Sequence, residues 1–314
     1  MSRIARLVTT TYLLVLCAAS VGRAGHIESA SMGGSTSNGF SVFSTPTKWN
    51  PGTNSASIFR ANKKGPRTAG GASWSIMGAG HTDASGADSS HGANTSELIT
   101  GLNVSGFGAS DYEGMVDAVL NVWADASGFT NLGQVADRGV SAGASESIGG
   151  HLGDIRLAAW EIAEANVLAH AYQPGSEAIF GTGGTIAGDV HVDVNRTWSD
   201  DPTDTNADAD VDLMTVLLHE LGHSLGLGHS TTSGSVMEAV YGGARRELTA
   251  DDLAGIHYIY GSNEANDGGG GGGKPPWAGG PGGRSIVPEP SSTLLATLGW
   301  ICLLATRGQR RSRL

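Results

Sequence analysis

The sequence predicts an α+β domain in which three helices accompany a set of short strands. Three segments carry apolar residues at helical spacing, and shorter segments between them are apolar or alternating, as strands are. The chain has 314 residues, which is enough for one sizeable domain or two small ones. Glycine is abundant at 49 residues, and Gly-rich stretches separate the predicted elements.

The three predicted helices have recognisable ends. They cover residues 111–126, 214–225 and 249–260. For the second helix, Asp212 or Asp210 is placed to cap the free backbone amides of the first turn. In the third helix, Thr249 and Asp252 approximate a capping box, and Gly261 is a stop signal.

The predicted strands are short runs of apolar or alternating residues. They are expected at residues 74–77, 98–104, 129–135, 155–159, 167–172 and 189–194. A short helix or turn is expected at 161–166, with loops at 78–95 and 175–188. Residues 200–212 form an acidic run that lacks the Gly and the terminal Glu of an EF-hand, so we interpret it as a solvated loop.

Charge and cysteine content exclude some classes of partner. The net charge is −11 and the pI is about 5.3, so nucleic acid is not an expected partner. The two cysteines, Cys17 and Cys302, lie in apolar runs near the two ends of the chain. The region between them therefore has no disulfide and no thiol that could block a metal.

Residues 1–24 have the pattern of a secretory signal peptide. Two arginines precede an apolar stretch from Leu7 to Ser20, and small residues offer a cleavage site before Gly25. Residues 25–70 are polar and rich in Ser, Thr and Gly, and they are predicted to be a loose leader or a short edge strand. The signal predicts that the domain after it is exported.

Residues 263–287 are predicted to be a flexible Gly-rich linker, and residues 288–314 form a tripartite tail. The tail has Pro288-Glu289-Pro290, then a short apolar stretch from Thr293 to Thr306, then four arginines. It resembles the PEP-CTERM sorting signal of Gram-negative bacteria. The resemblance implies processing by an exosortase-like enzyme after transient membrane anchoring, at the cell surface or in the extracellular matrix. A plain C-terminal anchor is the alternative.

The most specific pattern runs from His219 to His229 and reads H-E-x-x-H-x-x-G-x-x-H. His219 and His223 are four residues apart and share one face of a helix, where two imidazoles can bind one Zn²⁺. Gly226 allows the helix to end in a left-handed turn, so the chain can fold back and offer His229 as third ligand. A fourth position stays open for water and substrate, as a catalytic site requires.

Glu220 follows the first ligand and is the predicted catalytic residue. A carboxylate there can take a proton from zinc-bound water and pass it to the leaving amine, and the metal lowers the pKa of that water to about 7. A surface helix with ordinary histidines is the alternative, but it does not account for the glycine and the third histidine. A closed structural zinc site is disfavoured, because nothing supplies a fixed fourth ligand.

At this motif and downstream of it, the chain closely resembles the matrixins, a branch of the metzincin metalloproteases. The matching segments are residues 153–155, 168–175, 188–193, 219–230, 235–237, 248–256 and 260–261. The resemblance covers roughly residues 73–261, so the catalytic domain is predicted at 71–262. It implies a twisted mixed sheet, mostly parallel, with three helices and a cleft over the zinc helix.

The resemblance also implies further site residues. Met237 would be the Met-turn residue beneath the metal, and an ordinary core methionine is the alternative. Tyr241 would help wall the pocket for the residue after the scissile bond, and Thr215 would lie near the floor of that pocket. The family usually has Pro where this chain has Ala239, which is a departure in the pocket wall.

A second, structural zinc is implied with only part of its ligand set. His170 and His191 match the two strand histidines of that site, but the loop that supplies a His and an Asp is missing. Two ligands do not make a closed zinc site. His151 and Glu164 are the candidate substitutes, and the alternative is two strand histidines that make polar contacts only.

Calcium is implied at two places. Asp154 and Asp189 match ligands of one matrixin calcium, together with carbonyls of the Gly-rich loop between them, and oxygen ligands suit Ca²⁺. The second site is expected to be lost, because Arg196 stands where the family has a Glu ligand. Arg196 is expected to pair with Asp193 and to replace the charge of the ion.

These patterns predict a metalloendopeptidase that hydrolyses peptide bonds of extracellular proteins by means of a zinc-activated water and Glu220 as general base. Its expected partners are protein or peptide substrates. Two alternatives stay open: a surface or matrix protein whose metalloprotease fold serves binding, and a zinc hydrolase acting on non-peptide amides. The intact Glu220 argues against the first, and a panel of substrates would separate the second.

Overall fold

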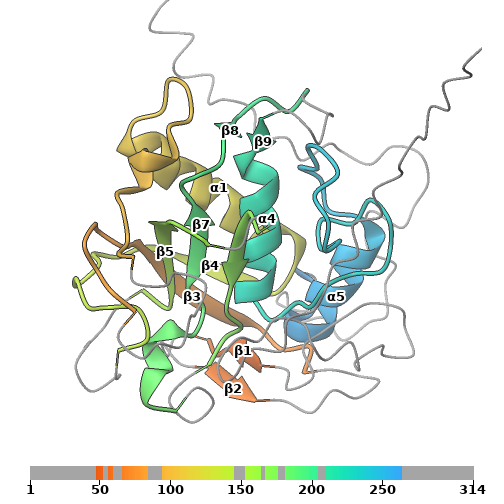
Figure 1. Cartoon of the computed structure of the whole chain (residues 1–314). Coiled ribbons are helices and arrows are strands. Elements are labelled where there is room, and N and C mark those ends of the chain that lie inside the picture. The colour runs from red at the N-terminus through yellow and green to blue at the C-terminus, as the bar shows by residue number, and fades with distance from the viewer. Residues whose placement is uncertain are drawn as a thin grey trace, which may run out of the picture.

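The structure, a computed structural model, describes residues 47–51, 56–58, 66–83, 94–144, 153–163, 167–175, 181–203 and 210–263. At their centre lies a five-stranded sheet with the order β4-β3-β5-β7-β6 (Figure 1). Its parallel strands are β3 (Gly70–Ile76), β4 (Phe129–Gln134), β5 (Ile155–Trp160) and β7 (Val190–Asp193). The edge strand β6 (Ala169–Ala171) runs antiparallel to β7. The predicted α+β architecture with a mixed, mostly parallel sheet is thus confirmed.

Among the described residues, three α-helices accompany the sheet, as predicted. They are α1 (Ala109–Ala126), α4 (Leu213–Ser224) and α5 (Ala250–Tyr260). Helix α1 packs against β4 and α4, and α4 packs in turn against β6 and β7. The indole Nε1 of the buried Trp123 donates to the carbonyl of Leu218 at 3.2 Å, which joins α1 to α4 in the core.

The helix ends follow the capping residues of the sequence. Asp212 is the N-cap of α4 and accepts a hydrogen bond from the amide of Thr215 at 3.0 Å. Thr249 and Asp252 form a reciprocal capping box at the start of α5. Helix α4 ends at Ser224, and Gly226 has a φ of +103°, in the left-handed region that the sequence analysis assigned to it.

Residues 25–70 were predicted to be a loose leader or a short edge strand, and their described part contains short strands. Strand β1 (Thr47–Trp49) pairs antiparallel with β2 (Ala56–Ile58), and β3 already begins at Gly70. Trp49 is buried, and its Nε1 donates to the carbonyl of Ser224 at 2.8 Å, where α4 ends. Burial of this large aromatic side chain makes β1 part of the domain, although the surrounding sequence is polar.

Two predicted elements differ in type from those observed. The strand expected at 98–104 is wrong, because Ile99–Leu102 forms a 3-10 helix whose two apolar ends, three residues apart, are both buried. Within the loop expected at 175–188, residues Gly181–Ile186 also form a 3-10 helix. At 98–104 the apolar run was too short for its period to separate helix from strand, whereas 181–186 has Ile186 as its single large apolar residue and no period at all.

Two further segments are corrected in part. Residues 161–163 of the expected helix or turn have no regular structure, and residues 164–166 lie outside the described part. The acidic run at 200–212 ends in β9 (Val211–Asp212), which pairs in parallel with β8 (Trp198–Ser199) just before α4. Its residues 204–209 are not described, so the interpretation as a solvated loop stays a prediction there.

The predicted signal peptide, all but the first residue of the linker, and the C-terminal tail lie outside the described residues. Among the residues that are described, no helix has both the length and the apolar character needed to cross a membrane. Transient membrane anchoring through the tail therefore stays a prediction.

Candidate metal centre and active site

Three histidines from two segments converge at the end of α4. His219 and His223 lie on the helix, and His229 follows the left-handed turn at Gly226. The ligand nitrogens of all three lie within 4.8 Å of one another. The structure thus brings together the side chains that the H-E-x-x-H-x-x-G-x-x-H pattern predicted, and among the described residues they form the one cluster with metal-ligand geometry.

The second ring nitrogen of each helical histidine is held by a backbone carbonyl. His219 Nδ1 donates to the carbonyl of Val236 at 2.8 Å, and His223 Nδ1 donates to that of Leu227 at 2.8 Å. Because a carbonyl only accepts, these bonds place the proton on Nδ1 and leave Nε2 as a bare lone pair. The two Nε2 atoms face each other at 3.0 Å. Two lone pairs at that distance repel unless a cation lies between them, so the site fits a bound Zn²⁺.

The environment keeps the histidines neutral, as metal ligands must be. Burial, which is the largest cause, and the neighbouring His229 together lower the pKa of His219 to about 4. The hydrogen bond to the carbonyl of Val236 raises this pKa by a smaller amount. Burial and the two other histidines lower the pKa of His223 well below its usual range. The Nε2 atoms of His219 and His223 are therefore free of competing protons at neutral pH.

Glu220 lies on the same turn of α4 and is 6% exposed. Burial raises the pKa of this carboxyl group to about 8, and the charge of His170 offsets only part of the shift. A carboxyl group in such surroundings binds a proton readily and releases it when a positive charge approaches. The side chain predicted as general base thus has the environment of a group that exchanges protons near neutral pH.

Met237 packs directly beneath the zinc helix. A Cβ atom placed on Gly222 would lie 2.4 Å from Met237 Sδ and 3.1 Å from Trp123 Cζ2, so a residue without a side chain is needed at this position of α4. The carbonyl of the preceding Val236 is the partner of His219 Nδ1. The turn around Met237 therefore supports the helix by packing and orients one histidine by a hydrogen bond.

Asp252 holds that turn in place. Its buried carboxylate accepts the amides of Val236 and Met237, each at 3.1 Å, and the hydroxyl of Ser235. The same carboxylate accepts the amide of Thr249 at 2.8 Å as part of the α5 capping box. The local sequence predicts Asp252 as part of a helix cap but does not predict this second contact, because Met237 is fifteen residues away along the chain.

Thr215 and Tyr241, the predicted pocket residues, are joined through Asp212. The amide of Asp212 donates to the Tyr241 hydroxyl at 2.9 Å, and the Thr215 hydroxyl donates to the Asp212 carboxylate at 2.6 Å. Asp212 also pairs with Arg246, and the Thr215 hydroxyl accepts the amide of Arg245 at 2.7 Å. Both arginines were missed, since no local pattern in the sequence connects them to α4.

His170 and His191 are brought together, as the resemblance implied. They face each other from the antiparallel pair β6 and β7, and His170 Nε2 lies 3.1 Å from His191 Nδ1. This contact is of the polar kind that was predicted as the alternative to a structural zinc. His151 and Glu164 lie outside the described residues, so a complete ligand set is not on view and the structural zinc stays a prediction.

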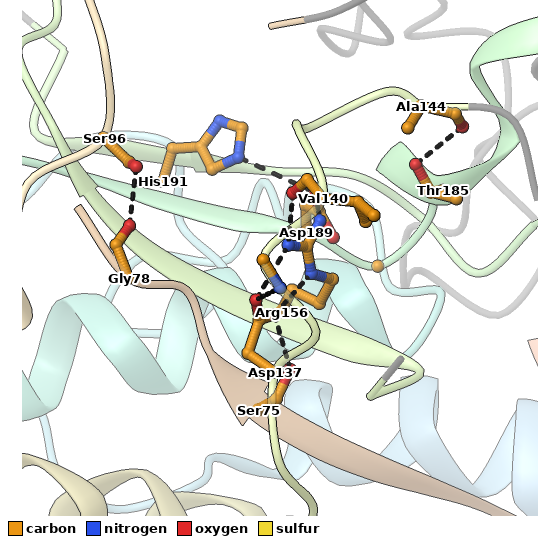
Figure 2. A network of polar contacts seen from close by, with 12 residues as sticks. Ser75, Gly78, Ser96, Asp137, Val140, Ala144, Arg156, Thr185, Asp189 and His191 are labelled. Atoms are coloured by element: carbon orange, nitrogen blue, oxygen red, sulfur yellow. Dashed lines mark hydrogen bonds and ion pairs between the residues drawn. The ribbon is translucent and has the colours of Figure 1, made fainter. Parts of the chain in front are cut away.

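The two predicted calcium ligands lie in different surroundings. One carboxylate oxygen of Asp154 accepts both the amide and the hydroxyl of Ser73, at 2.7 and 2.8 Å. Asp189 is fully buried, and burial raises the pKa of its carboxyl group to about 8 even though the charge of Arg156 lowers it. Arg156 Nη1 lies 3.9 Å from this carboxylate (Figure 2).

The predicted pairing of Arg196 with Asp193 is confirmed. Arg196 Nε lies 2.8 Å from the buried Asp193 carboxylate, and Arg196 Nη2 donates to the carbonyl of Val167 at 2.9 Å. The other carboxylate oxygen of Asp193 accepts the backbone amides of Asn195 and Ile162 at 3.0 and 3.3 Å. The Asp193 carboxylate is thus paired with a guanidinium and accepts hydrogen bonds from two backbone amides.

A mixed sheet carrying an H-E-x-x-H helix, a third histidine after a glycine turn and a methionine beneath them is the arrangement typical of the metzincin class of metalloproteases. Within that class, residues 160–261 match the family model of the matrixins. The match includes the three histidines, Glu220 and Met237.

Several named proteins are similar to part of this chain. Matrilysin from Rattus norvegicus is 44% identical over 99 residues, which are 31% of this chain and 32% of the relative. Neutrophil collagenase from Homo sapiens is 43% identical over 100 residues, 30% of this chain and 18% of the relative. Matrix metalloproteinase-18 from Xenopus laevis is 32% identical over 160 residues, 49% of this chain and 30% of the relative. The chain spans about a third or less of the length of these relatives.

Proposed function

We propose that this protein is a zinc-dependent endopeptidase that hydrolyses peptide bonds of extracellular proteins. In this proposal His219, His223 and His229 hold the catalytic zinc, and Glu220 is the general base. The observation that carries it is the pair of Nε2 lone pairs 3.0 Å apart, each oriented by a carbonyl on the far side of its ring. The matrixin match over residues 160–261 supports the same reading.

The residues divide the chemistry between them. When bound at the three histidines, Zn²⁺ would polarise the scissile carbonyl and make water acidic enough to deprotonate near neutral pH. Glu220 stands next to the first ligand in sequence and is buried, so its carboxylate takes the proton from the attacking water and delivers it to the leaving amine. The positive charge of the ion favours the ionised form of Glu220 before the reaction. No serine or cysteine nucleophile is required.

Met237 and the two pocket residues hold other groups in position and take no part in the reaction itself. Met237 packs against α4 at Gly222, next to His223, and so holds this face of the helix in the position that the ligands need. Tyr241 and Thr215 are proposed to line the pocket for the residue after the scissile bond. Their support is the Asp212 network, which ties both side chains to the start of the zinc helix.

Export and anchoring are proposed from the two ends of the chain. The signal-like residues 1–24 would direct export, and the tail at 288–314 would anchor the protein until an exosortase-like enzyme removes it. The protein would then act at the cell surface or in the extracellular matrix. Mass spectrometry of the mature protein tests this, because an intact tail on the released form would contradict the proposed processing.

The proposed activity is tested with quenched fluorescent peptides, the purified protein and its Glu220→Ala and Glu220→Gln variants. We expect cleavage that a zinc chelator abolishes, that added zinc restores and that both variants lack while still binding zinc. Zinc content, measured separately, distinguishes a damaged site from a missing base. Zinc-loaded wild-type protein that cleaves no peptide and behaves as the variants do would instead support the binding function.

The same zinc measurement addresses the structural site. If the protein binds one zinc per chain and His223→Ala loses it, the catalytic ion is the one zinc bound. A second equivalent that is lost with His170→Ala, while catalytic zinc remains, would establish a structural zinc at His170 and His191. Substrate class is tested in parallel with non-peptide amides, and turnover of these alone would favour the alternative hydrolase.

A further inference from the structure

A buried arginine faces the carboxylate that would hold the first calcium. Arg156 on β5 is 1% exposed, and its register places it beside the segment that begins β7. Its guanidinium donates from Nε to Asp137 at 2.8 Å and from Nη2 to the carbonyl of Val140 at 2.8 Å. The remaining nitrogen, Nη1, lies 3.9 Å from Asp189 (Figure 2). The guanidinium is therefore wedged between two acidic side chains in the interior.

The charge of Arg156 lowers the pKa of the buried Asp189 carboxyl group, against the effect of burial, and so favours its ionised form. Both of its carboxylate oxygens are buried and accept no hydrogen bond from the described residues. A buried carboxylate without hydrogen-bond donors needs a nearby positive charge or a proton. The guanidinium of Arg156 supplies a permanent charge, because arginine stays protonated at all physiological pH values.

The carboxylate of the second calcium site, which the sequence predicts to be lost, has the same kind of partner. Arg196 is paired with the buried Asp193 at 2.8 Å and anchored on the carbonyl of Val167. The Asp154 carboxylate, which was expected to help hold the first ion, uses an oxygen to accept two hydrogen bonds from Ser73. At both places, therefore, a guanidinium lies beside the carboxylate that the family resemblance assigns to calcium.

We infer that two internal guanidinium groups, those of Arg156 and Arg196, replace bound calcium at Asp189 and Asp193. Each arginine provides the positive charge that an ion would otherwise supply to a buried carboxylate. A divalent cation at the same carboxylate would lie beside the guanidinium and be repelled by it. The folded state at these two positions is consequently independent of the calcium concentration outside the cell.

Calcium titration of isosteric variants tests the inference with the purified, zinc-loaded protein. The thermal unfolding midpoint is measured with and without saturating CaCl₂ for the wild type, Asp189→Asn and Asp193→Asn. We expect calcium either to leave all three midpoints unchanged or to shift all three by the same amount. Calcium bound elsewhere, for example in the acidic run at 204–209, would shift all three equally. A calcium shift that is present in the wild type and lost in either variant would overturn the inference.

A double-mutant cycle tests whether the arginines are the countercharges. Arg156→Met should lower the midpoint by several degrees, because it removes the guanidinium from Asp137 and Asp189 and leaves Asp189 beside the His191 imidazole, 3.9 Å away. Adding Asp189→Asn should recover part of that loss, and Arg196→Met with Asp193→Asn should behave alike. Purely additive losses in both cycles would overturn the inference, since they would show no coupling between guanidinium and carboxylate. If an arginine variant does not fold, the calcium titration of the asparagine variants still decides.

Discussion

The backbone amide of Met237 donates a hydrogen bond of 3.1 Å to the carboxylate of Asp252, the residue that caps helix α5. One carboxylate thereby fixes two features, the first turn of α5 and the turn that lies beneath the histidines. Because the carbonyl of Val236 in that turn orients His219, the cap of α5 acts on the metal centre through two hydrogen bonds.

Asp252→Ala is therefore expected to damage stability and metal binding together. The change leaves several buried donors without an acceptor, which should cost about 2–4 kcal/mol of unfolding free energy. Zinc affinity should fall roughly tenfold or more, as it does when an outer hydrogen-bond partner of a ligand is lost. Urea unfolding and competitive zinc titration measure the two effects. Thr231→Ala, at an exposed position near the turn, is the matched control and should change neither.

Two glycine substitutions in helices should have opposite effects on stability. Gly222→Ala forces Met237 and Trp123 apart and should destabilise by about 1–3 kcal/mol while reducing peptidase activity. Gly114→Ala in α1 meets nothing within 4 Å and should stabilise by about 0.5–1 kcal/mol, because alanine favours the helix. Thermal unfolding of both variants checks the signs. A neutral Gly222→Ala would show that Met237 does not support the helix as proposed.

The His219 side chain should reduce the stability of the metal-free protein in mild acid. Burial lowers the pKa of His219 to about 4 in the folded chain from an ordinary value of 6.5, so between these values this residue binds more protons in the unfolded chain. The contribution of His219 to stability is therefore complete above about pH 6.5 and is lost as the pH falls towards 4, by about 3 kcal/mol. Urea unfolding of zinc-free protein across this range measures the slope. The His219→Gln variant should have a shallower slope, and equal slopes would contradict the assignment.

Trp49 should matter to the domain although it precedes the matched matrixin region. Trp49→Phe keeps an aromatic ring but removes the hydrogen bond to Ser224, which should cost about 1 kcal/mol. Trp49→Ala also empties a buried site and should cost about 3–5 kcal/mol. Chemical unfolding ranks the two variants. If residues 47–49 were a dispensable leader, both variants would match the wild type.

Much of the active site could be predicted from local patterns. The spacing of His219, His223 and His229 follows from helix geometry and one glycine turn, so the ligand set and the end of α4 were available from the sequence. The helix caps at Asp212 and Thr249 could be predicted likewise, because each cap bonds a residue three positions further along the chain. The 3-10 helix at Ile99–Leu102 was mistaken for a strand, because four residues contain too little periodicity to decide between the two.

The sequence by itself determined which residues can bind the metal, which carboxylate stands beside it and where the main helices begin and end. These properties depend on neighbours within a few positions, and chain geometry imposes them directly. Only the tertiary structure decided that Trp49 seals the end of the zinc helix, that Asp252 holds the turn at Met237 and that Arg156 meets Asp189. These contacts join segments far apart in the chain, and their partners are set by strand order and by the packing of the core.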